Sequence, residues 1–248
     1  MKVNHEHTRI GDTILIEPAL AACAEAAGPI DLYVTPRYRE LYEGNPAVRL
    51  AGIPHDDPDV VPSAGEALAY AIDRNVPFAA VYFPQFGLEP RGRLHYEIHG
   101  GPFQESPEPL RLRRILIAPY ARSCHRHEGS APNLEPDPGW WDPILRCLPL
   151  PAFTLGEEHD ATLPNTQPMK GLPLRDVVWE MRRSSLLISV ETGILHLAGA
   201  ARIPSVFLSS ATPENVSRPT SDCQVIRAPS PSWDADEVIE AVESACRG

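Results

Sequence analysis

The sequence predicts an α/β protein with parallel sheets flanked by helices. Short β-like runs alternate along the chain with helical patterns, as a parallel sheet with crossover helices requires. The 248 residues suffice for one large domain or two small ones with a sizeable core. Periodicity is lost between Gln85 and Arg114, where glycine, proline and charge gather, so we place a domain junction there.

The first predicted domain, residues 1–108, begins with a weak strand and alternates strands with helices. Its strands are expected at Lys2–His5, Ile30–Thr35 and Phe78–Phe83. Its helices are expected near Pro18–Ala27, Arg37–Glu43 and Ala64–Asp73.

The second predicted domain, residues 109–248, repeats this alternation. Its strands are expected at Arg114–Ala118, Phe153–Leu155, Leu186–Val190 and Ser205–Leu208. Its helices are expected at Trp140–Cys147, Leu174–Arg183, Ile194–Ala201 and Asp234–Arg247. The last helix has acidic residues in its first turn, which suit the positive end of the helix dipole.

The most informative stretch joins the strand Leu186–Val190 to the helix behind it through Glu191, Thr192 and Gly193. The first backbone N–H groups of a helix lack partners, and the dipole there is positive. A phosphate placed beside Thr192 and Gly193 would therefore be stabilised. His196 lies about one turn into the helix, where it could reach the same anion. The same pattern is also ordinary core construction.

Composition excludes several classes of protein. With 22 basic and 33 acidic residues the formal net charge is −11, which opposes general attraction to nucleic acid or anionic membranes. No apolar run is long enough to span a membrane and the N-terminus has no secretory pattern, so we expect a cytoplasmic protein. The five scattered cysteines favour reduced thiols, and Cys124–Glu128 has no second ligand cluster, so no metal site is predicted.

Two stretches resemble signatures of glycosyltransferase family nine, the heptosyltransferases. The Glu191–Ala198 stretch is similar to the family's Asp-Thr-Gly-Pro-x-His-x-Ala motif, with Glu191 in place of Asp and Ile194 in place of Pro. Arg9–Leu20 resembles the N-terminal Gly-Asp-x-x-x-x-x-Pro-x-Leu segment. The stretch Ile30–Pro46 resembles the family's second βα unit.

The resemblance implies a GT-B fold, in which two Rossmann-like domains with parallel sheets face a cleft. The N-terminal domain, 1–108, would bind the acceptor, and the C-terminal domain, 109–248, would bind the nucleotide-sugar donor. The chain is shorter than the familiar lipopolysaccharide enzymes, and the shortening falls mainly in the N-terminal domain. The acceptor therefore cannot be carried over from the family.

The resemblance also assigns residues to the donor. The turn at Thr192 and Gly193 would hold the diphosphate with help from His196, and Glu191 could hydrogen-bond hydroxyls of the sugar. The family places a basic residue after the first strand of this domain, because the leaving diphosphate gains negative charge. Here the candidates in that loop are Arg122, Ser123 and Arg126.

An acceptor hydroxyl needs a base, and the family's aspartate at the position of Asp12 is proposed to serve in an inverting, single-displacement transfer. We expect Asp12 in the loop after the first strand, with Gly11 beside it and Arg9 orienting the acceptor or balancing the charge. The competing interpretation is that Asp12 only caps the following helix. No Asp-x-Asp motif is present, so we expect catalysis without a metal or other cofactor.

The leading hypothesis is a glycosyltransferase that uses a nucleotide sugar. Its acceptor would be a glycan, a small molecule or a modified nucleic-acid base. A second hypothesis is a non-catalytic GT-B-like protein that binds nucleotide sugars, motivated by Glu191 and the short first domain. A reductase or kinase is disfavoured, because neither a Gly-x-Gly-x-x-Gly turn nor a Gly-x-x-x-x-Gly-Lys-Ser/Thr loop occurs. The nucleotide base, the sugar and the oligomeric state stay open.

Overall fold

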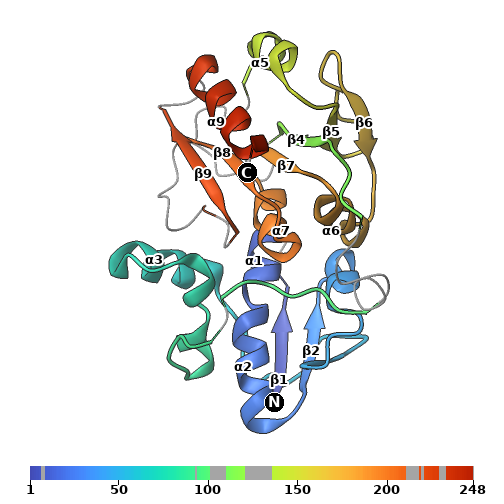
Figure 1. Cartoon of the computed structure of the whole chain (residues 1–248). Helices are drawn as coiled ribbons and strands as arrows, with labels where there is room; N and C mark the ends of the chain where they lie inside the picture. The colour runs from blue at the N-terminus through green and yellow to red at the C-terminus, as the bar shows by residue number, and fades with distance from the viewer. Residues whose placement is uncertain are drawn as a thin grey trace. The chain divides into compact units, whose positions relative to one another are not determined.

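The computed structural model divides into two compact units, Met1–Glu108 and Pro109–Gly248 (Figure 1). Each unit contains one sheet, and every strand pairing in both sheets is parallel. The structure describes residues 1–6, 9–92, 94–100, 110–120, 136–210, 218, 221–228 and 233–247. None of the described helices is long and apolar enough to cross a membrane.

The N-terminal unit is built on a three-stranded sheet in the order β1-β2-β3. Its elements are β1 (Lys2–His5), α1 (Ile10–Leu15), α2 (Glu17–Ala27), β2 (Ile30–Val34), η1 (Pro36–Tyr42), β3 (Val48–Leu50), α3 (Ala64–Arg74), η2 (Phe78–Ala80) and η3 (Phe83–Phe86). The strands bury alternate apolar residues, such as Ile30, Leu32 and Val34 of β2. Figure 1 shows α2 alongside β1 and β2, so its apolar side closes this core.

One strand prediction for this unit is wrong, and one predicted helix is of the 3-10 type. The stretch Phe78–Phe83 is not a strand but two 3-10 turns, η2 and η3, joined through Val81 in the helical region. The run is apolar because it is buried, and Pro84, which lacks an N–H, begins the next turn rather than extending a ladder. The helix expected at Arg37–Glu43 is the 3-10 helix η1, with Pro36 at its start.

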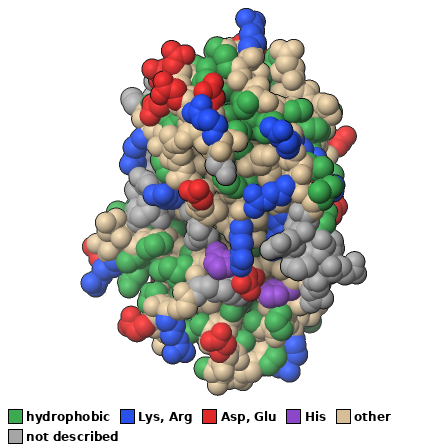
Figure 2. Space-filling model, in the orientation of Figure 1, with side chains coloured by type: hydrophobic (Ala, Val, Ile, Leu, Met, Phe, Trp, Pro, Cys, Tyr) green, Lys and Arg blue, Asp and Glu red, His purple; other side chains and the backbone are tan. Residues whose placement is uncertain are grey.

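Helix α3 carries exposed apolar side chains. Its Ala67 and Ala71 are fully buried, whereas Leu68 and Ile72 are 39% and 53% exposed. Figure 2 shows hydrophobic side chains gathered over this helix. The Ser63 hydroxyl accepts a hydrogen bond from the Glu66 N–H at 3.3 Å, which satisfies one amide of the first turn.

The C-terminal unit is built on a six-stranded sheet in the order β6-β5-β4-β7-β8-β9. Its elements are β4 (Ile115–Ala118), η5 (Pro138–Trp140), α5 (Trp141–Cys147), β5 (Ala152–Gly156), β6 (Gln167–Lys170), α6 (Leu174–Arg183), β7 (Leu186–Val190), α7 (Gly193–Ala201), β8 (Ser205–Ser209), β9 (Cys223–Arg227) and α9 (Ala235–Arg247). Its central strands β4, β7 and β8 are buried throughout, as parallel strands covered on both faces are.

Helices cover both faces of this sheet (Figure 1). On one face, α5 and α9 pack on alternate strand residues such as Ile115, Ile117 and Ile188, around the buried Trp141 and Trp233. The residues between them, including Leu116 and Leu187, are also fully buried and point to the opposite face, where α6 and α7 contact each other. This is a doubly wound α/β layer.

Candidate functional site

The strand order of the C-terminal unit creates a ligand-binding position. When the strands are numbered along this unit alone, their order in the sheet is 3-2-1-4-5-6. The first strand, β4, and the fourth, β7, are therefore neighbours at the centre. The later strands are added outward from β4 on one side and from β7 on the other. In open α/β sheets, ligands bind outside the carboxyl ends of the strands at this switch point. Ala118 of β4 pairs with Ser189 of β7. The next residues after β7 are the Glu191-Thr192-Gly193 turn.

The turn has the backbone of a helix start. Thr192 is the N-cap of α7, with an extended backbone (φ −142°, ψ 157°), and its side chain makes no capping hydrogen bond. The Leu195 N–H donates to the Thr192 carbonyl at 3.0 Å, which is the first hydrogen bond of the helix. The amides of Gly193 and Ile194 precede it in the sequence and lie at the N-terminal end of α7. Two backbone donors and the positive end of the dipole therefore lie at the switch point.

His196 lies one turn inside α7. Burial lowers the pKa of His196 to about 4, because desolvation disfavours the imidazolium. The ring is therefore neutral at physiological pH. It can offer a hydrogen bond to an anion but not a positive charge.

The Glu191 side chain is 4% exposed and is directed to the neighbouring strand. Its Oε1 accepts hydrogen bonds from the Ser210 N–H at 3.1 Å and the Ser209 hydroxyl at 3.4 Å, and its Oε2 accepts from the Ser210 hydroxyl at 3.5 Å. The sequence hypothesis assigned these oxygens to hydroxyls of a donor sugar. The hydrogen bonds give them partners within the protein.

The basic loop after β4 was the other predicted donor element. Arg122, Ser123 and Arg126 lie outside the described residues, as does Cys124. Tyr120, just before them, is described, and its hydroxyl donates to the Ala161 carbonyl at 2.6 Å.

In the N-terminal unit, Asp12 lies in a helix and not in the loop we expected. Arg9 is the N-cap of α1, Gly11 is buried, and Asp12 is the third helical residue. The Arg9 carbonyl accepts from both the amide and the hydroxyl of Thr13, at 3.2 and 2.9 Å, which fixes the start of the helix. Asp12 is therefore not the helix N-cap, which was the competing interpretation.

The Asp12 carboxylate is 7% exposed and has a buried aromatic neighbour. The Tyr82 hydroxyl donates to Asp12 Oδ1 at 3.3 Å, and Tyr82 is fully buried. Burial, with the carboxylate beside it, raises the pKa of Tyr82 far above its ordinary value, so the phenol keeps its proton. Sequence reasoning missed Tyr82, because it lies 70 residues from Asp12 in a run that resembles a strand.

Glu17 is a second buried carboxylate that sequence reasoning passed over. It opens α2 and is fully buried. Its Oε1 accepts from Asn45 Nδ2 at 3.1 Å, and its Oε2 accepts from the Glu97 N–H at 3.3 Å. These bonds connect three distant segments of the unit, so the evident role of Glu17 is structural.

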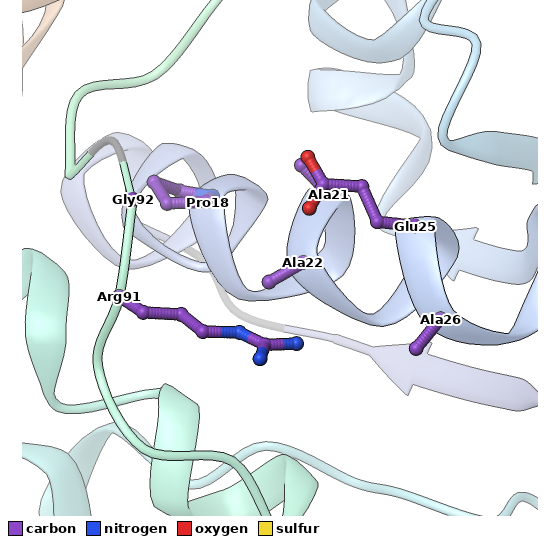
Figure 3. Close-up of a pocket in the computed structure, with 7 residues that line it drawn as sticks. All are labelled: Pro18, Ala21, Ala22, Glu25, Ala26, Arg91 and Gly92. Atoms are coloured by element: carbon purple, nitrogen blue, oxygen red, sulfur yellow. The ribbon is translucent and has the colours of Figure 1, made fainter.

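The N-terminal unit also has a hollow of about 470 Å³ along α2 (Figure 3). Its lining is mostly small or apolar, with Arg91 and Glu25 as charged residues: Pro18, Ala21, Ala22, Glu25, Ala26, Arg91 and Gly92. In Figure 3 the Arg91 side chain runs along the helix beside Ala22 and Ala26. The hollow follows the side of a helix and includes none of the predicted site residues.

Among the described residues, no three side chains of His, Cys, Asp or Glu come together in a way that could hold a metal ion. Four of the five cysteines are described, and the structure records no disulfide among them: Cys23, Cys147, Cys223 and Cys246. Burial raises the pKa of the Cys23 thiol, which disfavours the reactive thiolate.

No protein-family model and no curated protein sequence matches the chain. Several solved structures are similar to it. Escherichia coli ADP-heptose LPS heptosyltransferase II is 13% identical, with 100% of this chain and 99% of that chain covered and a TM-score of 0.73. A family 9 glycosyltransferase from Veillonella parvula is 14% identical, with 99% and 97% covered and a TM-score of 0.70.

E. coli heptosyltransferase WaaC, solved with ADP, is 13% identical, with 99% of this chain and 100% of that chain covered and a TM-score of 0.68. Identities this low establish the fold and nothing finer. The prediction of a GT-B-like α/β fold with parallel sheets is thereby confirmed: the chain has the fold of GT-B glycosyltransferases.

Proposed function

We propose that this protein transfers a sugar from a nucleotide-sugar donor to an acceptor hydroxyl. The observation that carries the proposal is the Thr192–Gly193 turn, which starts α7 at the switch point of a sheet wound in the order of dinucleotide-binding proteins. The GT-B fold supports it, because the similar solved structures are named as heptosyltransferases. The two family-nine-like motifs of the sequence support it further.

The donor's diphosphate would bind at the start of α7. The amides of Gly193 and Ile194 would donate to phosphate oxygens, and neutral His196 would add a third donor. These groups would stabilise the charge that develops on the leaving diphosphate as the glycosidic bond breaks. Arg122 or Arg126, with Ser123, would add positive charge and a hydroxyl.

Asp12 would be the base that removes the acceptor's proton as the hydroxyl attacks. Its carboxylate is nearly buried and receives a hydrogen bond from Tyr82, so it is held in one position. A single displacement of this kind inverts the sugar's configuration and needs no covalent intermediate. Gly11 and Arg9 would border the acceptor, and metal-independent catalysis without a cofactor belongs to the same proposal.

The first test is a thermal-shift screen with UDP, GDP, ADP, CMP and dTDP sugars. A ligand that binds only the folded protein raises its stability, by about 2.7 kcal/mol when its concentration is 100 times Kd. We expect one nucleotide class to raise the melting temperature. A flat response across the whole panel would contradict the proposal.

The second test assigns roles to residues. Asp12→Asn should lower turnover by about 10²–10⁴-fold and leave donor binding nearly intact, because only the proton acceptor is lost. His196→Ala should weaken donor binding. Asp31→Asn, which removes an exposed carboxylate paired with Arg49, is the control. Full turnover in Asp12→Asn would exclude it as the base.

Binding of a nucleotide sugar by the wild-type protein without any product would favour the alternative function, a non-catalytic nucleotide-sugar-binding protein. Glu191 in place of the family's aspartate is the observation behind that alternative. Product formation, measured by mass spectrometry across a panel of acceptors, separates the two functions.

A further inference from the structure

The Glu191 side chain connects the turn at the switch point to the next strand of the sheet. The backbone pairing of β7 and β8 runs up to Val190 and Leu208, so Glu191 and Ser209 are the next residues beyond that ladder, and Ser209 still pairs with Arg227 of β9. The carboxylate then bonds the Ser210 N–H at 3.1 Å and the hydroxyls of Ser209 and Ser210. One side chain therefore continues the pairing beyond the ends of the strands.

The strand end to which Glu191 is bonded is itself fixed. The Ser209 carbonyl accepts hydrogen bonds from the Trp233 indole N–H at 2.9 Å and from the Ala228 N–H at 3.2 Å. Trp233 is 3% exposed and belongs to the core around α5 and α9. Glu191 thus ties the turn to a rigid part of the unit.

Glu191 is also a poor candidate for direct contact with the diphosphate region. It directly precedes Thr192, and like charges in a site of low dielectric repel each other strongly. The hydrogen bonds that join its carboxylate to Ser209 and Ser210 are directed to β8 and the residue after it. An aspartate here would be one methylene shorter, about 1.5 Å, and could not reach the same donors with the same backbone.

We propose that Glu191 is a positioning residue, which holds the Thr192–Gly193 turn against the end of β8 so that the turn can receive the donor's diphosphate. It does not contact the donor's sugar. This inference rests on the proposed function and replaces the hypothesis that Glu191 hydrogen-bonds hydroxyls of the donor's sugar. It accounts for the longer side chain by its reach to Ser210.

The experiment compares binding of a nucleoside diphosphate with binding of its nucleotide sugar by calorimetry. The probes are ADP and ADP-glucose, UDP and UDP-glucose, and GDP and GDP-mannose, and the pair that binds the wild-type protein most tightly is used throughout. The variants are Glu191→Ala, Glu191→Asp and Glu191→Gln. Glu180→Ala is the matched control, because Glu180 pairs with Arg114 in the same unit.

If Glu191 acts through the turn, Glu191→Ala weakens the binding of the diphosphate and of the nucleotide sugar by the same factor, about tenfold, since a buried hydrogen-bonding group is lost. Glu191→Asp weakens both as well. Glu191→Gln keeps an oxygen for the Ser210 N–H and stays within about threefold of wild type. Glu180→Ala lowers the melting temperature but leaves both affinities unchanged.

Selective loss of the nucleotide sugar, with the bare diphosphate unaffected, would show that Glu191 contacts the sugar and would overturn the inference. Unchanged affinity for both ligands in Glu191→Ala and Glu191→Asp would overturn it as well. If the wild-type protein binds none of the six probes and no CMP or dTDP sugar either, the proposed function itself fails, which is a different result. Should Glu191→Ala not fold, the Asp and Gln variants decide.

Discussion

The carboxylate of Asp12 is oriented by a buried phenol. Because the Tyr82 hydroxyl donates to Oδ1 at 3.3 Å, the nearly buried carboxylate is held in one orientation. The Tyr82 phenol keeps its proton and so remains a donor. The proposed base thus depends on a residue that carries no recognisable motif.

Tyr82→Phe should therefore lower kcat, because the carboxylate of Asp12 loses the hydrogen bond that holds it in one orientation. The loss in unfolding free energy should be about 0.5–1.5 kcal/mol. The control is Tyr42→Phe, whose hydroxyl donates to the Thr13 carbonyl instead. An unchanged kcat in Tyr82→Phe, measured beside Tyr42→Phe, would contradict the account.

His196 gives a prediction about stability and pH. Its pKa is lowered to about 4 in the folded protein, so between about pH 6.5 and 4 the unfolded chain binds a proton that the folded protein does not. Stability is lost as pH falls through that window. His196→Gln should remove on the order of 1 kcal/mol of the stability difference between pH 7 and pH 5, measured by urea unfolding. Identical pH dependence in both proteins would contradict an imidazole that stays neutral in the folded protein.

At the scale of elements, the sequence identifies strands that are buried on both faces and helices that bury one face at regular spacing. The prediction for α6 coincides with Leu174–Arg183 and that for β7 with Leu186–Val190. The three strands it missed, β3, β6 and β9, lie at sheet edges, where polar residues are tolerated. Edge strands leave little hydrophobic signal, and β6 even contains Pro168.

The same reasoning explains what could be predicted of the site. The Thr192–Gly193 turn is local in sequence, because a strand, a turn and a helix follow one another directly. The hydrogen-bond partners of the other proposed site residues are distant in sequence. Ser210 lies 19 residues from Glu191, and Tyr82 lies 70 residues from Asp12. Such contacts depend on strand order and on 3-10 turns that periodicity does not reveal.

The start of α2 depends on one such distant contact. Asn45 donates its amide to Glu17 Oε1 at 3.1 Å, and its own Oδ1 accepts the Ala47 N–H at 2.8 Å. Asn45→Ala leaves the fully buried Glu17 carboxylate with one hydrogen-bond donor fewer, so the substitution should lower the free energy of unfolding by about 1–3 kcal/mol.

Asp31→Ala breaks the exposed pair with Arg49 and serves as the control, with an expected cost of about 0–1 kcal/mol. Urea unfolding measures both variants. Equal costs for Asn45→Ala and Asp31→Ala would contradict the structural role of Glu17.

For the whole molecule, the negative net charge limits the classes of acceptor that the protein can bind. With a net charge of −11, the protein should not bind unmodified duplex DNA appreciably at about 0.15 M salt, as measured by fluorescence anisotropy. The basic residues that could form a local DNA-binding surface are Arg91, Arg93, Arg111, Arg113 and Arg114. Arg114 is engaged with Glu180 and Ser184, and Arg93 lies outside the described residues.

Micromolar binding that falls steeply with salt would contradict this expectation and would favour a nucleic-acid acceptor. Weak or absent binding leaves glycans and small molecules as the acceptor classes to test.

The central claim is that a nucleotide's diphosphate binds at the start of α7. A crystal structure of the protein with the nucleoside diphosphate that gives the largest thermal shift tests it most directly. The account predicts phosphate oxygens within about 3 Å of the Gly193 and Ile194 amides, beside neutral His196. Phosphates bound elsewhere, for example beside Arg91 in the hollow along α2, with the Thr192–Gly193 turn empty, would contradict it.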